Sequence, residues 1–229
     1  MIQVTEVKNN NDLKSFIGFP DKLYKGNKYR VPQLHTYEKS ALSSKINPAF
    51  DFCEAKLWLI YKGNDVAGRI AGIINHRANE IWNEKVVRFG WIDFIDDIKV
   101  SETLLKTVED WGKSKGMSKV QGPLGFSDMD LEGMLVEGFD EIGTQAVIYN
   151  HPYYPTHLEK YEYSKDVDWV QYEIKVPNEI PDKVKRISEL VQTKYGLRIL
   201  NFKNAKEILP YANQMFNVLN EAFKNLYGF

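Results

Sequence analysis

Alternating apolar and polar residues define the first half of the chain as a series of strands. Residues 2–8 alternate with a period of two, which predicts a strand. The apolar segments 57–61 and 66–74 are separated by Gly63-Asn64-Asp65, a turn sequence, so they predict a β-hairpin. Residues 86–94 are apolar on both faces, which is typical of a strand in the interior of a sheet.

Helical spacing appears directly after that interior strand. Five apolar residues recur every three to four positions, with Ser101 as the expected N-cap and Gly116 at the expected left-handed C-terminal position: Val100, Leu104, Leu105, Val108 and Trp111. Residues 119–121 then form a short strand before Gly122-Pro123. Because strand, helix and strand follow within about 35 residues, we expect a βαβ unit with parallel strands.

The remaining pattern is a mixture of helices, two further strands and two irregular segments. Residues 76–85 are read as variable, and residues 122–150 have weak periodicity, which predicts a functional loop or an unrecognised helix. Further strands are expected at 167–176 and 197–202. Further helices are expected after Asn11-Asp12, at 34–42, 155–161, 182–195 and 204–226.

Composition restricts the kinds of partner. The chain has 229 residues, 43% of them hydrophobic, and a net charge of -1 from 30 basic and 31 acidic side chains. A nucleic-acid binder normally carries a basic stripe, and none is present. No apolar run approaches the ~18 residues of a membrane helix, and the alternating start does not resemble a signal peptide. We therefore expect a cytoplasmic protein that binds neither nucleic acid nor membrane.

Metal and cysteine chemistry are not expected. The single cysteine, Cys53, cannot form an internal disulfide, and its pattern indicates a buried small side chain rather than a nucleophile. The four histidines are scattered without metal-ligand spacing, so no metal is predicted: His35, His76, His151 and His157.

The order of these elements resembles the fold of the GNAT superfamily of acyl-CoA N-acyltransferases. The segment His157-Leu158-Glu159-Lys160-Tyr161-Glu162-Tyr163 is similar to the superfamily pattern Tyr-Glu-Lys-x-Gly-Phe. The resemblance covers roughly residues 2–176 and implies an α+β fold with a mixed central sheet flanked by helices.

A narrower set of motifs resembles a bacterial GNAT-like family of putative N-acetyltransferases with two units in tandem. The motifs are Gly122-Pro123, Ser127, the run 132–140 (Glu-Gly-Met-Leu-Val-Glu-Gly-Phe-Asp) and Tyr149-Asn150-x-Pro152-Tyr153-Tyr154. We accordingly expect a GNAT-like domain at 1–176. Residues 177–229 are expected to begin a second, incomplete unit, or to form a helical extension that packs on the first unit or mediates a homodimer.

The resemblance implies a site for acetyl-CoA or another acyl-CoA, and the sequence departs from the family there. The diphosphate-binding loop should precede the helix after the central strand, so Lys99, Val100 and Ser101 are the candidate contacts. The stretch 95–102 has no glycine, and it carries Asp96, Asp97 and Glu102 beside a single lysine. Gly122 marks the place where the strands would separate to admit the pantetheine arm, or an ordinary strand end.

The same resemblance guides the choice of acid, base and acceptor pocket. Leu158 occupies the position of the usual catalytic tyrosine, so Tyr154 or Tyr153 is the candidate acid, and Asp93 is a better candidate base than Glu137. Ser127, Asn150 and His151 are expected to line the pocket for a small-molecule substrate. The leading hypothesis is an N-acyltransferase acting on an unknown amine. The alternative is a non-catalytic GNAT-like module that binds a small molecule or a protein.

Overall fold

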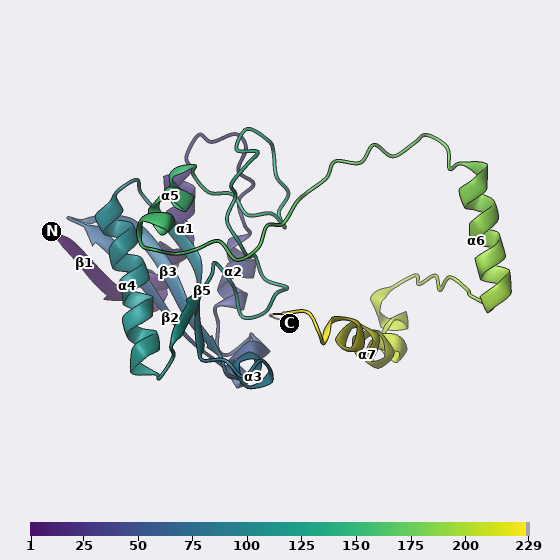
Figure 1. The fold of residues 1–229 in the computed structure, drawn as a ribbon, viewed down its shortest axis with the longest axis horizontal. Helices are drawn as coiled ribbons and strands as arrows, with labels where there is room; N and C mark the ends of the chain where they lie inside the picture. The colour runs from purple at the N-terminus through teal and green to yellow at the C-terminus, as the bar shows by residue number, and fades with distance from the viewer. Residues whose placement is uncertain (228–229) are drawn as a thin grey trace. The chain divides into compact units, whose positions relative to one another are not determined.

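The computed structural model describes residues 1–227 (Figure 1). The chain divides into two compact units, one of residues 1–164 with Leu226 and Tyr227, and one of residues 165–225. Each unit is described by itself. The candidate site lies in the first unit.

The first unit is built on one five-stranded sheet. Its strands are β1 (Ile2–Glu6), β2 (Cys53–Lys62), β3 (Asp65–Asn75), β4 (Val86–Phe94) and β5 (Lys119–Gln121), and they pair in sequence order. The first three pairings are antiparallel and the β4–β5 pairing is parallel. The predicted hairpin, interior strand and βαβ unit are therefore confirmed. The fold is α+β, a mixed sheet flanked by helices with the GNAT element order.

Helices connect and cover these strands. They are α1 (Asn10–Leu23), α2 (His35–Ala41), η1 (Pro48–Asp51), α3 (His76–Ile81), α4 (Ile98–Ser114) and α5 (Tyr153–Lys160). The segment expected to be variable contains α3. The start of α1 is capped by Asn9, not by Asn11 or Asp12, because the Asn9 side chain accepts the first free amides. No helix among the described residues is long and apolar enough to cross a bilayer.

The prediction that Ser101 caps α4 is wrong. The N-cap is Asp97, whose side chain accepts the Lys99 amide, and the helix begins at Ile98. Ser101 lies one turn inside the helix, is fully buried, and donates its hydroxyl to the Ile98 carbonyl. The expected end is confirmed, since Gly116 has a φ of +79° directly after the C-cap.

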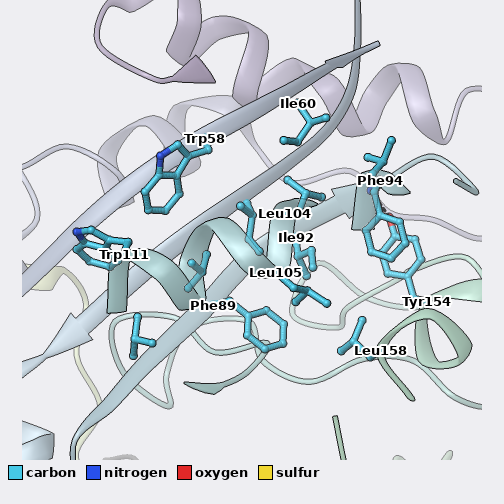
Figure 2. Close-up of a cluster of buried hydrophobic side chains, with 14 of the residues drawn as sticks. Trp58, Ile60, Phe89, Ile92, Phe94, Leu104, Leu105, Trp111, Tyr154 and Leu158 are labelled. Carbon is cyan, nitrogen blue, oxygen red and sulfur yellow. Dashed lines mark hydrogen bonds between the residues drawn. The ribbon is translucent and has the colours of Figure 1, made fainter. Parts of the chain in front are cut away.

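The apolar stripe of α4 packs on one face of the sheet (Figure 2). Leu104, Leu105 and Trp111 meet the side chains of β2 to β4, including Trp58 and Phe89. The opposite face holds a second cluster that includes Phe16 of α1, Leu42 and Phe126. The sheet therefore separates two apolar layers.

A β-bulge interrupts β4 just before its end. Arg69 pairs with Asp93 and Ala71 pairs with Gly90, so Trp91 and Ile92 together lie opposite Ile70. Trp91 has a φ of +45°, which a side chain other than glycine rarely adopts. The additional residue reverses the alternation: Phe89, Ile92 and Phe94 all point into the α4 layer. Asp93 is consequently turned to the side of the sheet where Arg69 lies.

The second unit contains α6 (Asp182–Tyr195), η2 (Ala205–Glu207), η3 (Leu209–Tyr211) and α7 (Ala212–Phe223). The helix expected at 182–195 is confirmed, and the helix expected from 204 begins only at Ala212. The strands expected at 167–176 and 197–202 are wrong, because no described segment pairs with either, and a strand needs a hydrogen-bonded neighbour to persist. Their apolar side chains are exposed instead.

Candidate active site

Asp93 is the centre of a buried polar network at the end of β4. Its Oδ1 accepts hydrogen bonds from the Tyr24 hydroxyl at 3.0 Å and the Tyr154 hydroxyl at 3.3 Å. The two hydroxyl oxygens lie 2.9 Å apart. Tyr24 is the C-cap of α1 and Tyr154 belongs to α5, so elements distant in sequence converge on one carboxylate.

The other oxygen of Asp93 is held by a buried arginine. Arg69 donates from Nε to Asp93 Oδ2 at 2.8 Å, and from Nη1 to Glu38 Oε1 at 3.3 Å and the Phe16 carbonyl at 3.1 Å. The exposed fractions of Glu38, Arg69 and Asp93 are 6%, 6% and 7%. Burial alone would lower the pKa of the Arg69 guanidinium, but the carboxylates of Asp93 and Glu38 raise it, so this side chain is a fixed cation.

The tyrosines of this network keep their protons at neutral pH. Burial, followed by the adjacent Asp93 carboxylate, raises the pKa of both Tyr24 and Tyr154 above the ordinary value. The pKa of Tyr153 is also raised, by burial and then by Asp96 and Asp93. The hydroxyls are therefore protonated hydrogen-bond donors at neutral pH.

Both backbone groups of Phe94 on the free side of β4 are occupied by tyrosines of α5. The Phe94 amide donates to the Tyr154 hydroxyl at 3.0 Å, and the Tyr153 hydroxyl donates to the Phe94 carbonyl at 2.6 Å. The next residue, Ile95, faces β3, since its amide donates to the Ala67 carbonyl. Figure 2 shows the Tyr154 ring lying against Phe94, and their centroids are 4.1 Å apart. On this edge of β4, both backbone groups of Phe94 therefore already have hydrogen-bond partners.

The first turn of α4 is also occupied, by its own carboxylate. Asp97 Oδ1 accepts the Lys99 amide at 3.0 Å, and Asp97 Oδ2 lies 2.8 Å from the Lys62 ammonium. The amides of Val100 and Ser101 donate to the Asp97 carbonyl, and both side chains are fully buried. These three predicted contact residues thus sit together at the helix start. The anion bound at this helix start is thus the carboxylate of Asp97 itself.

His157 of α5 contacts the start of α4 through both of its ring nitrogens. His157 Nδ1 lies 2.9 Å from the Ser101 hydroxyl, and His157 Nε2 lies 3.0 Å from Asp96 Oδ1. The order Ser, His, Asp resembles a catalytic triad. The Ser101 oxygen is directed at the Ile98 carbonyl and is fully buried, however, so the arrangement joins two helices rather than presenting a nucleophile.

The predicted pocket residues do not lie together. His151 stacks on Tyr24 with centroids 4.7 Å apart, so it lies beside the Asp93 network, whereas the side chain of buried Asn150 bonds both the amide and the carbonyl of Leu135. Ser127 belongs to a different place, next to Phe126 and Asp130, which is bonded to the Ser127 amide. Gly122 packs against the Phe89 carbonyl at the end of β5. The roles assigned to all four stay predictions.

Tyr24, Arg69 and Glu38 were not predicted from the sequence. Tyr24 lies 69 residues from Asp93, so no local spacing connects them. Arg69 did carry a signal, because it is the only charged residue in the otherwise apolar segment 66–74. A charge in a buried strand needs a partner of opposite charge, and Asp93 on the neighbouring strand was the nearest acid available.

Two hollows were found elsewhere in the described residues. One, of about 480 Å³, lies beside β2 and is lined by Cys53, Phe50, Lys56 and Trp111 among others, and one of about 550 Å³ lies between α6 and residues 197–199. Burial raises the pKa of the Cys53 thiol to about 11, so it is protonated and unreactive at neutral pH. No group of three potential ligands among residues 1–227 could hold a metal ion.

The fold and this network define a protein with the GNAT architecture and a tyrosine–aspartate cluster at the end of its central strand. No known family model matches the chain. It is 32% identical over 213 residues to Protein YghO of Escherichia coli K12, covering 91% of this chain and 54% of that protein. It is 27% identical over 230 residues to a bacterial ceramide synthase of Caulobacter vibrioides, covering 100% of this chain and 59% of that protein.

The chain thus spans between half and two thirds of the length of these curated relatives. A solved structure of a predicted acetyltransferase with acetyl-CoA, from Clostridium acetobutylicum, matches 76% of this chain and 96% of its own at 9% identity and a TM-score of 0.45. The assignment of the architecture rests on the strand order and pairing described above.

Proposed function

We propose that this protein contributes to N-acyl transfer, in which an amine displaces the thiol of an acyl thioester such as acyl-CoA. The observation that supports this function is the Asp93–Tyr24–Tyr154 cluster at the bulged end of β4. It places a carboxylate and two protonated hydroxyls within hydrogen-bond distance of one another, beside the free edge of the strand.

The reaction needs one proton removed and one proton supplied. The amine nitrogen bonds to the acyl carbon and the carbon–sulfur bond breaks, so the nitrogen loses a proton and the thiolate gains one. Asp93 accepts the proton of the amine, directly or through Tyr24. Tyr154 donates its hydroxyl proton to the departing sulfur and takes a proton from Tyr24, which in turn recovers one from the protonated Asp93. At the end of the cycle, each of these protein groups has its starting protonation state again.

The name of one relative agrees with this chemistry. A ceramide is the N-acylated form of a long-chain amino alcohol, so a ceramide synthase forms an amide from an amine. The 27% identity to such an enzyme extends along the whole of this chain. On this basis we propose a small-molecule amine as the acceptor, and an amino alcohol with a long chain is the first acceptor to test.

One observation favours a second function, that of a GNAT-like module which binds a ligand without catalysis. The Phe94 backbone groups are bonded to Tyr153 and Tyr154, and the Lys99 amide is bonded to Asp97. In this conformation the edge that would receive an acyl donor is satisfied internally. Under this alternative, His151 and Asn150 contact a ligand, and the donor edge stays closed.

The test compares the two functions directly. The chain is mixed with acyl-CoA of two to sixteen carbons and with amino-alcohol acceptors, and the release of free thiol is followed with a colorimetric thiol reagent. We expect release that depends on the acceptor and that falls at least about 100-fold in Asp93→Asn. Asp110→Asn, an exposed acid on α4, is the matched control and should retain full activity. Acceptor binding by calorimetry without thiol release, in the wild type, would favour the non-catalytic module.

A further inference from the structure

We infer that Arg69 is a positioning residue that fixes the orientation of Asp93, an inference that rests on the proposed transfer function. Arg69 bonds only one of the two carboxylate oxygens, Oδ2, through Nε at 2.8 Å. Oδ1 is thereby left for the hydroxyls of Tyr24 and Tyr154. Rotating the carboxylate would break the Arg69 bond and both tyrosine bonds together.

The guanidinium is itself held from two further elements. Its Nη1 donates to the Phe16 carbonyl in α1 and to Glu38 in α2, and its centre lies 5.1 Å from the centroid of the Phe16 ring. A planar guanidinium that meets partners in several directions cannot pivot without losing some of them. Through Arg69, the position of Asp93 at the end of β4 consequently depends on the positions of α1 and α2.

Stability alone does not account for this arrangement. Two buried carboxylates share one cation, so the group carries a net negative charge in a region that excludes water. Replacing buried ion pairs by well-packed apolar residues is often neutral or stabilising. A group retained for stability would need only one acid. The second acid, Glu38, is explained if its role is to accept a hydrogen bond from Nη1 of Arg69, the nitrogen that does not contact Asp93.

The groups that face Asp93 are known from each element packed against it. They are Tyr24 at the end of α1, Arg69 of β3 and Tyr154 of α5, with Glu38 of α2 behind Arg69. Changes at Arg69 should therefore act on the reaction through Asp93.

The test uses three variants of the whole chain. Arg69→Met alone leaves two buried carboxylates without a cation and is expected to fold poorly. The double variant Arg69→Met/Glu38→Gln keeps the buried net charge of the wild type but removes the support of Asp93. Glu38→Gln alone is the matched control, since the glutamine oxygen can still accept the hydrogen bond from Arg69 Nη1 and the bond between Arg69 and Asp93 is kept. Turnover and KM are measured for each, with tyrosine ring signals recorded by NMR after selective ¹³C labelling.

We expect the double variant to fold, to keep the KM of the acyl donor within about threefold, and to lose about 100-fold in kcat through misplacement of the base. The ring signals of Tyr24 and Tyr154 should shift in the double variant and stay in place in Glu38→Gln.

Wild-type kcat and unshifted tyrosine signals in the folded double variant would overturn the inference. The NMR comparison does not depend on catalysis. If the wild type transfers no acyl group, the proposed function fails, and the ring signals still decide whether Arg69 orients Asp93.

Discussion

Asp97 caps α4 at the helix N-terminus, which is the position proposed for the phosphates of an acyl donor. Its carboxylate accepts the Lys99 amide and pairs with Lys62, as an incoming anion would do. Hydrogen bonding from Lys62 lowers the pKa of Asp97, so the carboxylate is ionised well below neutral pH. An acyl-CoA that approaches this turn therefore competes with a charge of the same sign.

We predict that Asp97→Asn increases the affinity for CoA by about tenfold, because the repulsion between carboxylate and phosphate is removed near a solvent-exposed surface. Asparagine caps helices as well as aspartate does, so the thermal stability should hardly change. Calorimetric titration with CoA checks the affinity. Equal affinities in the wild type and Asp97→Asn would mean that the diphosphate does not meet this turn.

The two neighbouring tyrosines should differ in their importance for turnover. Tyr154→Phe removes a hydroxyl that contacts Asp93, Tyr24 and the Phe94 amide, and we predict a loss of about 100-fold in kcat. Tyr153→Phe removes only a bond to the Phe94 carbonyl and should cost less than about tenfold. Steady-state thiol release separates them. An equal loss in both variants would contradict the role given to Tyr154.

At the scale of elements, α4 and β4 pack so closely at Gly112 that there is no room for an additional methyl group. A Cβ added at Gly112 would lie 2.4 Å from a methyl carbon of Val87, too close for any real contact. We predict that Gly112→Ala lowers the free energy of unfolding by about 1–3 kcal/mol, despite the better helix propensity of alanine. Urea denaturation measures the change, and Lys113→Ala, on the exposed side of the same turn, is the control.

Elements that form from local sequence were predictable, and those that depend on partners were not. The hairpin 57–74, the interior strand 86–94 and the α4 stripe follow from periodicity, turn residues and Gly116. The strands expected at 167–176 and 197–202 have the right alternation, but pattern alone cannot supply the neighbouring strand that they need.

The candidate site was predictable only in part for the same reason. Asp93, Tyr153, Tyr154 and His151 were selected from sequence, and the structure places them around the end of β4, whereas Asn150 bonds Leu135. Tyr24 and Glu38 reach Asp93 and Arg69 through the packing of α1 and α2 on the sheet, which no spacing in the sequence encodes. The cap of α4 was missed because Ser101 and Asp97 are equally good capping residues, and packing of Val100 and Leu104 decides between them.

At the scale of the whole molecule, the two units differ in how much apolar surface they bury. Residues 165–181 form no helix or strand and are exposed, whereas the first unit has buried cores on both faces of its sheet. We predict that limited trypsin digestion cuts first at Lys165 or Lys175, because proteolysis needs an exposed, locally unfolded segment. Mass spectrometry of the earliest fragments identifies the site. Early cuts within β2 to β4 would contradict the packing described here.

The helices of the second unit carry exposed apolar side chains, including Leu190 of α6 and Met215 and Phe216 of α7. Surfaces of this kind promote association in water. The homodimer expected from the sequence is therefore still a prediction, and multi-angle light scattering at several concentrations tests it. Met215→Lys should shift the distribution toward monomer if α7 mediates the contact. A wild type that is monomeric at all concentrations would exclude this dimer.

The additional residue in β4 has a consequence for how distant relatives should be compared. Deleting Trp91 would restore plain alternation and leave Asp93 paired with Arg69, because Ile92 alone would then lie opposite Ile70. A related chain without the bulge would thus carry the same carboxylate two positions after its equivalent of Gly90, and not three positions after it as in this chain. Alignments in this region should count positions from the paired Arg69, and not rely on matching letters.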